Sequence, residues 1–233
     1  MVAPINPPTS RIRFPSPDTW VDDDLVGVGG DLEPGTILEA YRSGLFPMPL
    51  EDGMLGWWSP LERAILPFSK LKISRSLSRS CRKFRVSVDA DASGVIAGCS
   101  DPDRPGGWIT DEMAEAYLAL HRLGWVHSFE VWDSDAELVG GLYGVAIGGL
   151  FCGESMFYRV TDASKVALVH LVSVLAEGGG LMLDVQWQTD HLASLGAQVI
   201  GRAAYLDRLP SALSGPDPFE GLDLDGPSVI EFA

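Results

Sequence analysis

Cysteine is scarce in this sequence, and no long hydrophobic run is present. Three cysteines, Cys81, Cys99 and Cys152, are scattered through 233 residues without a C-x-x-C pair, which excludes a disulfide framework and a cysteine-based zinc site. The longest uncharged run, residues 138–153, has 16 residues and is interrupted by glycine, so it is too short to span a bilayer. The N-terminus has no basic region followed by an apolar one. We therefore expect a soluble, reduced, cytoplasmic protein.

Motifs for metals and nucleotides are also missing. The four histidines show no H-E-x-x-H or other ligand spacing. The glycine-rich segments 27–30 and 141–144 lack the G-x-G-x-x-G and P-loop patterns, and the R-x-x-G-x-G/A loop of coenzyme A enzymes is not found. We therefore expect no metal and no cofactor. The histidines are His121, His127, His170 and His191.

Basic residues are few and unevenly placed. There are 17 Lys and Arg against 32 Asp and Glu, which gives a net charge of −15 and argues against nucleic acid as a general partner. Residues 63–85, however, hold bases and no acid. A helix there would align some of them in one stripe, which could be a solvated face or a local polyanion site. The bases are Arg63, Lys70, Lys72, Arg75, Arg79, Arg82, Lys83 and Arg85; the stripe is Lys72, Arg75, Arg79 and Arg82.

Hydrophobic periodicity predicts a mixed fold. Helices are expected at 34–43, 72–83, 110–124 and 164–176, with a helical turn at 191–195. Strands are expected at 84–88, 128–132, 138–146, 150–157 and 181–187, and a last strand or short helix at 199–206. Residues 46–60 suggest an aromatic loop region, and the acidic tail from Ser214 is expected to be poorly ordered. The pattern favours a mixed α/β or α+β fold with a central sheet.

Polar residues in two predicted strands are candidates for chemistry. Asp184 and Gln186 share one face of an otherwise apolar strand, either as a structural hydrogen-bonding pair or as part of a functional cleft. Glu154 would face away from Phe151 unless Gly153 marks a bulge; alternatively, it is a solvated edge residue.

Two further possibilities remain open. Ser155, Asp184 and His191 follow the chain order of a serine hydrolase triad, although the second glycine of G-x-S-x-G is missing. Trp57, Trp58 and Trp108 are either packing anchors or stacking platforms for a base.

The chain resembles the leucyl/phenylalanyl-tRNA–protein transferase family over about residues 14–209. The resemblance rests on ordered motifs that include GGDL at 29–32, AYRSGLFP at 40–47, WWSP at 57–60, FCGESMF at 151–157, ASK at 163–165 and DVQ at 184–186. It implies a small N-terminal domain (1–63), an acetyltransferase-like (GNAT-like) catalytic domain (64–213) and a tail (214–233). It also implies transfer of Leu, Phe or, less well, Met from aminoacyl-tRNA to the N-terminal Arg or Lys of a protein, which marks that protein for bacterial N-end-rule degradation.

The resemblance also implies roles for individual residues. Asp184 and Gln186 match a catalytic pair, Glu154 an acid near the acceptor, and Trp108 a tryptophan on the terminal adenosine. Departures from the family pattern are Met48 for a Trp that stacks on the adenine, Asp162 and Thr189 for Asn residues, and Leu171 and Leu175 for pocket aromatics. The implied aminoacyl pocket is Leu142, Phe151, Leu171 and Leu175. The implied tRNA contacts are Lys72, Arg75, Arg79, Arg82 and Lys83. We expect a monomer with no membrane partner; a non-catalytic tRNA-binding module is the remaining alternative.

Overall fold

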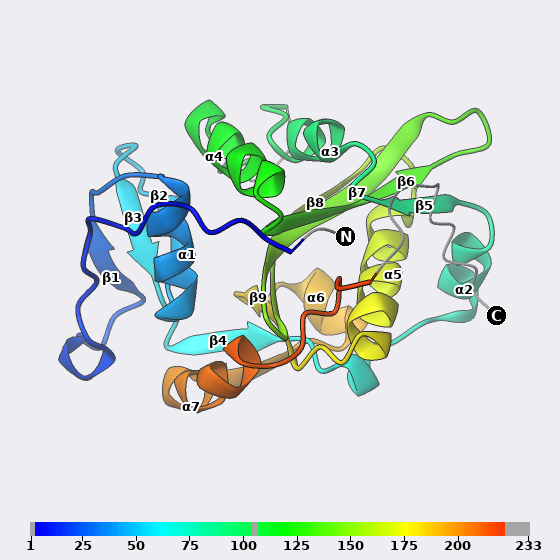
Figure 1. The fold of residues 1–233 in the computed structure, drawn as a ribbon. Helices are drawn as coiled ribbons and strands as arrows, with labels where there is room; N and C mark the ends of the chain where they lie inside the picture. Colours follow the sequence, from blue (N-terminus) through cyan, green and yellow to red (C-terminus); the bar gives the residue numbers. More distant parts are fainter. Residues whose placement is uncertain (1–2, 104–106, 222–233) are drawn as a thin grey trace.

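A mixed seven-stranded sheet forms the centre of the molecule in the computed structural model, which describes residues 3–103 and 107–221 (Figure 1). Its strand order is β10-β4-β9-β8-β7-β6-β5; β8 and β9 run parallel and the other neighbours antiparallel. This confirms the predicted mixed α+β class with a central mixed sheet. The strands are β4 (Glu62–Ile65), β5 (Arg85–Val88), β6 (Val126–Trp132), β7 (Leu138–Ile147), β8 (Leu150–Tyr158), β9 (Met182–Gln186) and β10 (Gln198–Gly201).

Helices cover both faces of this sheet. On one face, α5 packs against β6, β7 and β8, with α2 beside it; on the other, α3 and α4 cover the same strands (Figure 1). Because α5 is apolar nearly all round, it is buried along its length, as its sequence predicts. The helices are α1 (Pro34–Arg42), α2 (Arg75–Cys81), α3 (Ala92–Cys99), α4 (Asp111–Arg122), α5 (Ala163–Glu177), α6 (Asp190–Leu195) and α7 (Arg202–Leu213), with 3-10 turns at Pro17–Thr19 and Phe68–Lys70.

Side-chain caps fix where several helices begin. Thr110 accepts a hydrogen bond from the backbone N–H of Met113 at the start of α4, and Ser74 does the same for Leu77 in α2. Thr189 caps α6, and Asp162 stands before α5 with a φ of 71°. Asp and Asn tolerate this left-handed conformation better than other non-glycine residues, so Asp162 suits the position that an Asn holds in the family pattern.

A small three-stranded sheet lies beside α1 at the N-terminal end. It has the order β1-β3-β2, with β1 at Leu25–Val28, β2 at Phe46–Pro49 and β3 at Leu55–Trp58. The prediction of an aromatic loop region at 46–60 was therefore wrong: β2 and β3 pair antiparallel. The expected domain boundary at 63/64 falls inside β4, and all four residues of β4 belong to the large sheet.

The C-terminal segment is more ordered than its composition suggests. Acidic residues, glycine and proline predict a poorly ordered tail from Ser214, but residues 214–221 follow α7 across the core and Phe219 is fully buried. That part of the prediction was wrong, because one aromatic side chain is enough to attach a polar segment to the core. The rest of the predicted tail, residues 222–233, lies outside the described residues.

Candidate active site

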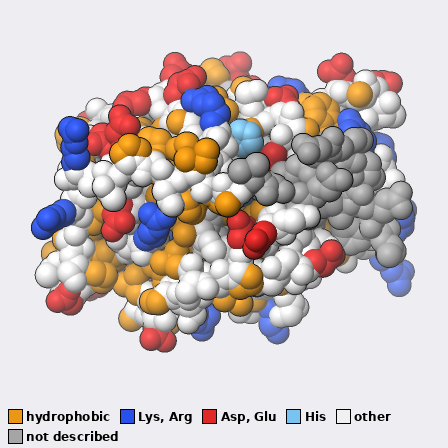
Figure 2. All heavy atoms as spheres, viewed as in Figure 1, with side chains coloured by type: hydrophobic (Ala, Val, Ile, Leu, Met, Phe, Trp, Pro, Cys, Tyr) orange, Lys and Arg blue, Asp and Glu red, His pale blue; other side chains and the backbone are white. Residues whose placement is uncertain are grey.

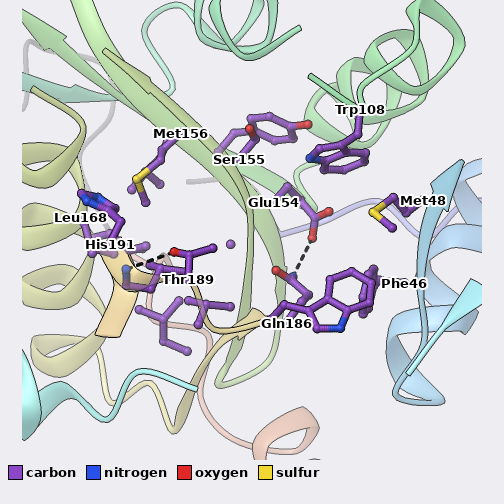
Figure 3. A pocket seen from close by; sticks show the side chains of 18 of the residues that line it. Phe46, Met48, Trp108, Glu154, Ser155, Met156, Leu168, Gln186, Thr189 and His191 are labelled. Carbon is purple, nitrogen blue, oxygen red and sulfur yellow. Dashed lines mark hydrogen bonds between the residues drawn. The ribbon is translucent and has the colours of Figure 1, made fainter. Parts of the chain in front are cut away.

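A cavity of about 330 Å³ opens between the large sheet, α5 and strand β2 of the small sheet. Its wall is mostly apolar, and Glu154 and Gln186 stand on it side by side (Figure 3). The Nε2 atom of Gln186 lies 3.5 Å from Oε1 of Glu154. An apolar cavity with a few convergent polar groups is the usual form of a small-ligand site.

The divergence of β8 from β9 creates this cavity. The parallel pairing of the two strands runs from Leu150 and Met182 to Cys152 and Asp184, and both strands deviate from regular geometry beyond it. In β8, Glu154 is the extra residue of a bulge, because Tyr143 pairs with Ser155 and Gly144 with Gly153. The sequence interpretation of a bulge at Gly153 is thus confirmed. The alternative of a solvated edge glutamate was wrong, because β8 is a central strand.

Gln186 ends β9 in a strained backbone conformation. Its φ is 57°, which is uncommon for a residue without glycine's freedom. Such strain persists only where the surroundings fix the conformation, and it concentrates at functional sites. Here the fixing group is Asp184, whose Oδ1 accepts a hydrogen bond from the backbone N–H of Gln186 at 2.9 Å.

Asp184 is itself held by a buried ion pair. Arg63 approaches it in a bidentate arrangement, with Nε 2.9 Å from Oδ1 and Nη2 2.5 Å from Oδ2. The Tyr205 hydroxyl donates to Oδ2 at 2.9 Å, and the Cys152 thiol lies 3.5 Å from the same atom. Asp184 has no exposed surface and is not part of the cavity wall. With donors on both oxygens, this carboxylate can position Gln186 but is poorly placed to receive a proton from a substrate.

Arg63 is the site residue that sequence reasoning missed. It counts among the bases of the 63–85 segment, yet it is 1% exposed and belongs to the site rather than to the surface. Although burial alone lowers the pKa of an arginine, the neighbouring Asp184 carboxylate raises the pKa of Arg63 above its ordinary value. A signal was available in the sequence: Arg63 lies in the apolar run RAIL, where a charge needs a buried partner.

Glu154 lies in a different environment from Asp184. It faces the cavity, and burial raises its pKa to about 7, even though hydrogen bonds from Tyr41 and Tyr117 act in the opposite direction. The Tyr117 hydroxyl donates to Oε2 at 2.7 Å, and the Tyr41 hydroxyl is 3.1 Å from that of Tyr117. A carboxyl group that titrates near neutral pH is suited to general acid–base chemistry.

Most of the residues predicted for the aminoacyl pocket and the adenosine also reach this cavity. Trp108 and Met48 lie at one side of it (Figure 3), while Leu142 and Leu171 belong to the apolar wall. Phe151 and Leu175 lie behind the wall, fully buried in the core. The sequence did not single out several further residues of the cavity wall, because a pattern of hydrophobic residues does not distinguish a cavity wall from a core. These residues are Phe46, Met156, Leu168, Leu183, Val185 and Trp187.

The predicted tRNA-binding residues lie on the surface around α2, away from the acidic side chains above α4. Lys72, Arg75, Arg79, Arg82 and Lys83 are all exposed on or beside α2. Acidic side chains stand out along the upper edge of the molecule, above α4 (Figure 2). Lys165 is 3.0 Å from Asp162, a pairing that lowers the pKa of that aspartate and offsets one positive charge beside the stripe.

The alternative interpretations find little support in this geometry. Ser155 and His191 line the cavity, but the Asp184 carboxylate is engaged by Arg63, Tyr205 and Gln186 rather than by His191 in the described part of the chain. Trp57 is a packing anchor, 2% exposed and edge-on to Phe14, while Trp58 packs against the wall residue Trp187.

Within residues 3–103 and 107–221, no group of three or more His, Cys, Asp or Glu side chains is placed to hold a metal. In the same ranges, no helix is both long and apolar enough to cross a membrane.

Comparison with known proteins identifies the chain as an aminoacyltransferase. The family described as leucyl/phenylalanyl-tRNA protein transferase matches residues 65–210, and the N-terminal domain of the same family matches residues 30–61. The chain belongs to this family, whose members transfer an aminoacyl group from tRNA to protein.

Curated relatives agree over nearly the whole length. The leucyl/phenylalanyl-tRNA–protein transferase of Anaeromyxobacter sp. (strain Fw109-5) is 47% identical over 220 residues, which cover 92% of this chain and 93% of that protein. The one from Aromatoleum aromaticum (strain DSM 19018 / LMG 30748 / EbN1) is 49% identical over 215 residues, or 89% and 90% of the two chains.

Similarities to solved structures are more distant. L-PGS from Bacillus licheniformis aligns with a TM-score of 0.38 and 13% identity over 64% of this chain and 51% of that one. The N-acetyltransferase region of a fungal multi-domain β-N-acetylglucosaminidase gives a TM-score of 0.46 and 10% identity over 76% and 23%. Both scores are below 0.5, so neither similarity establishes the fold.

Proposed function

We propose that this chain transfers leucine or phenylalanine, and methionine less well, from aminoacyl-tRNA to the N-terminal Arg or Lys of acceptor proteins. The observation that carries the proposal is the Glu154–Gln186 pair on the wall of an otherwise apolar cavity. The apolar part suits a hydrophobic side chain that is not branched at Cβ, and the two polar groups suit an amine. We further propose that the reaction takes place in the cytoplasm, by a monomer, and marks the acceptor for degradation.

The chemistry needs positioning and one proton acceptor. An aminoacyl ester is already activated, and an α-amine with a pKa of about 7.7–8.0 is partly neutral at cellular pH. The amine nitrogen attacks the ester carbonyl, a C–N bond forms, and the C–O bond to the terminal ribose breaks. The amine gives up a proton and the ribose oxygen receives one, so the step balances without a redox partner or nucleotide.

Three residues divide the work at the acceptor amine. Gln186 presents its side-chain amide to the cavity beside Glu154, where it can orient the amine. Glu154, whose pKa burial raises to about 7, serves as the proton acceptor. Asp184 acts through Gln186, because its oxygens hold the strained backbone of that residue and receive Arg63 and Tyr205. It is a positioning residue.

The donor end occupies the other parts of the site. We assign the terminal adenosine to Trp108, with Met48 across from it, and the aminoacyl side chain to the aliphatic wall that includes Leu142 and Leu171. A tRNA acceptor stem would then extend to the exposed bases on and beside α2, where phosphate contacts supply affinity.

Mass spectrometry tests the proposal. The protein is incubated with Leu-tRNA and a peptide that starts with Arg, and a mass increment of one leucine on the peptide is the expected product. An N-acetylated copy of the peptide controls for the α-amine, and an Ala-starting copy controls for acceptor choice. Absence of the increment on the Arg peptide, with intact Leu-tRNA present, would contradict the proposed function.

Donor choice provides a second measurement of the same site. Aromatic pairs contribute about 0.5–1.5 kcal/mol beyond burial, so a wall with Leu171 in place of a ring should favour Leu over Phe. We expect β-branched Val to be rejected. Values of kcat/KM for Leu-, Phe- and Val-tRNA decide the matter, and a Phe value at or above that of Leu would show that the wall leucines do not set the preference.

A further inference from the structure

The segment after α7 places an aromatic ring inside the core, one layer behind the cavity. Phe219 has no exposed surface. Its segment passes so close to the end of α5 that a Cβ at Gly178 would lie 2.5 Å from Cα of Pro218. Only glycine at 178 permits this approach. The family matches end at residue 210, so Phe219 lies outside them.

Aromatic contacts fix the position of the Phe219 ring. It stacks on His127 with a centroid separation of 3.9 Å and an interplanar angle of 15°. Nδ1 of His127 lies 2.7 Å from Oδ2 of Asp89, which holds the imidazole in place. On its other sides, the ring lies 6.3 Å from that of Phe129 and 5.8 Å from that of Phe151.

These two phenylalanines are the direct strand neighbours of cavity-wall residues. Phe129 on β6 pairs with Leu142 on β7, and Phe151 on β8 pairs with Leu183 on β9. Leu142 and Leu183 both line the cavity. Phe219 is therefore separated from the cavity by a single layer of side chains, and close packing transmits a change of volume across such a layer.

We infer that Phe219 sets the depth of the aminoacyl pocket and thereby the choice between Leu and Phe donors. The inference rests on the proposed function, because it takes the aliphatic wall as the binding site for the donor side chain. The wall is aliphatic at Leu142, Leu168 and Leu171, so the rigid rings that limit its depth lie behind it. With Phe219 in place, Phe151 and Phe129 cannot move back to admit a longer side chain.

The test compares donors in variants with a smaller residue at this position. Phe219→Leu removes ring volume next to Phe151 and should raise the ratio of kcat/KM for Phe to that for Leu by about three- to tenfold. Minimal donors, leucyl- and phenylalanyl-adenosine, keep tRNA binding out of the comparison. Phe219→Met, whose flexible side chain fills gaps better, should shift the ratio in the same direction by less and serves if Phe219→Leu does not fold.

Phe157→Leu is the matched control. It removes the same ring from the core, but Phe157 is buried on the opposite face of the sheet, against Gly98 of α3. The Phe157→Leu protein should be less stable than native, but its ratio of kcat/KM for Phe to that for Leu should not change. An unchanged ratio in a folded Phe219 variant, or an equal shift in Phe157→Leu, would overturn the inference while leaving the proposed function intact. Failure of the native protein to use either donor would overturn both.

Discussion

Two groups of charges in this molecule occupy opposite environments. The bases on and beside α2 stand in solvent, whereas Arg63, Asp184 and Glu154 are almost completely buried. An exposed charge can move and is screened by salt, so it contributes affinity for a polyanion but little precision. A buried charge is held in one geometry and its pKa can be tuned. Binding and chemistry are therefore separated in this fold, and each can be disturbed without the other.

The largest loss of stability is expected at the buried ion pair. Asp184→Ala leaves Arg63 without its partner, so unfolding free energy should fall by about 3–5 kcal/mol. Because Gln186 also loses the group that holds its backbone, single-turnover transfer should slow about 100-fold. Denaturant unfolding and transfer from a minimal donor are the measurements.

The double variant Arg63→Met, Asp184→Leu separates stability from positioning. Apolar residues of similar volume often replace a buried ion pair without loss of stability. The double variant should therefore recover most of the unfolding free energy but not the rate. Transfer within about threefold of native in this variant would remove the ion pair from the proposed mechanism.

Glu154→Gln should stabilise the protein at alkaline pH. The folded-state pKa of about 7 lies above the ordinary value of 4.5, so the native state binds its proton more tightly than the unfolded state. This contribution to stability is complete below pH 4.5 and is lost as pH rises through 7. At pH 8 the variant should be more stable than native by up to about 3 kcal/mol, from the shift multiplied by about 1.36 kcal/mol per unit.

Glu130→Gln is the control for the transfer measurements with Glu154→Gln. Glu130 is also buried and burial raises its pKa, but Ser87 donates to it at 2.6 Å and it lies outside the cavity wall. Glu130→Gln should leave the pH dependence of transfer unchanged. Equal stability of native and Glu154→Gln proteins from pH 5 to pH 9 would show that burial does not raise the pKa of Glu154.

At the exposed bases, substitution should weaken donor binding only. Changing Arg75, Arg79 and Arg82 to Ala should reduce the slope of log K against log salt by about 0.7–0.9 for each phosphate that the protein no longer neutralises. Transfer from leucyl-adenosine should remain near native, because that donor is too short to reach α2. Comparable reductions with both donors would mean that the separation between binding and chemistry is wrong.

Tyr117→Phe should produce the smallest change. Removal of the hydroxyl that donates to Glu154 at 2.7 Å withdraws one hydrogen bond from the carboxylate, so the pKa of Glu154 should rise further. A hydrogen bond to a charged group contributes about 1.5–3 kcal/mol, which corresponds to roughly one to two pH units. The midpoint of the pH–rate profile should move upward by about one unit, and a profile that stays in place would place Tyr117 outside the proton chemistry.

The sequence predicted exposed charge better than buried charge. Spacing of three and four predicted a basic helix, and α2 holds Arg75 and Arg79 of that stripe, with Arg82 as its C-cap and Lys72 before its start. The motif positions also singled out Glu154, Gln186 and Trp108, which all line one cavity. The partnership of Arg63 with Asp184 was not predictable, because 121 residues separate the two and their pairing depends on the alignment of β4 with β9. Phe219 was missed for a related reason: local composition indicates disorder and contains no information about the ring's distant partners.

The decisive experiment is the pH dependence of leucine transfer in the native and Glu154→Gln proteins. Single-turnover transfer from leucyl-adenosine to an Arg-starting peptide is measured from pH 5.5 to 9 in the two proteins. We predict a native rate that rises through pH 7 and a variant that is about 100- to 10,000-fold slower and follows only the acceptor amine, near pH 8. A variant that keeps the native rise through pH 7, at a rate within about threefold of native, would show that Glu154 does not accept the proton.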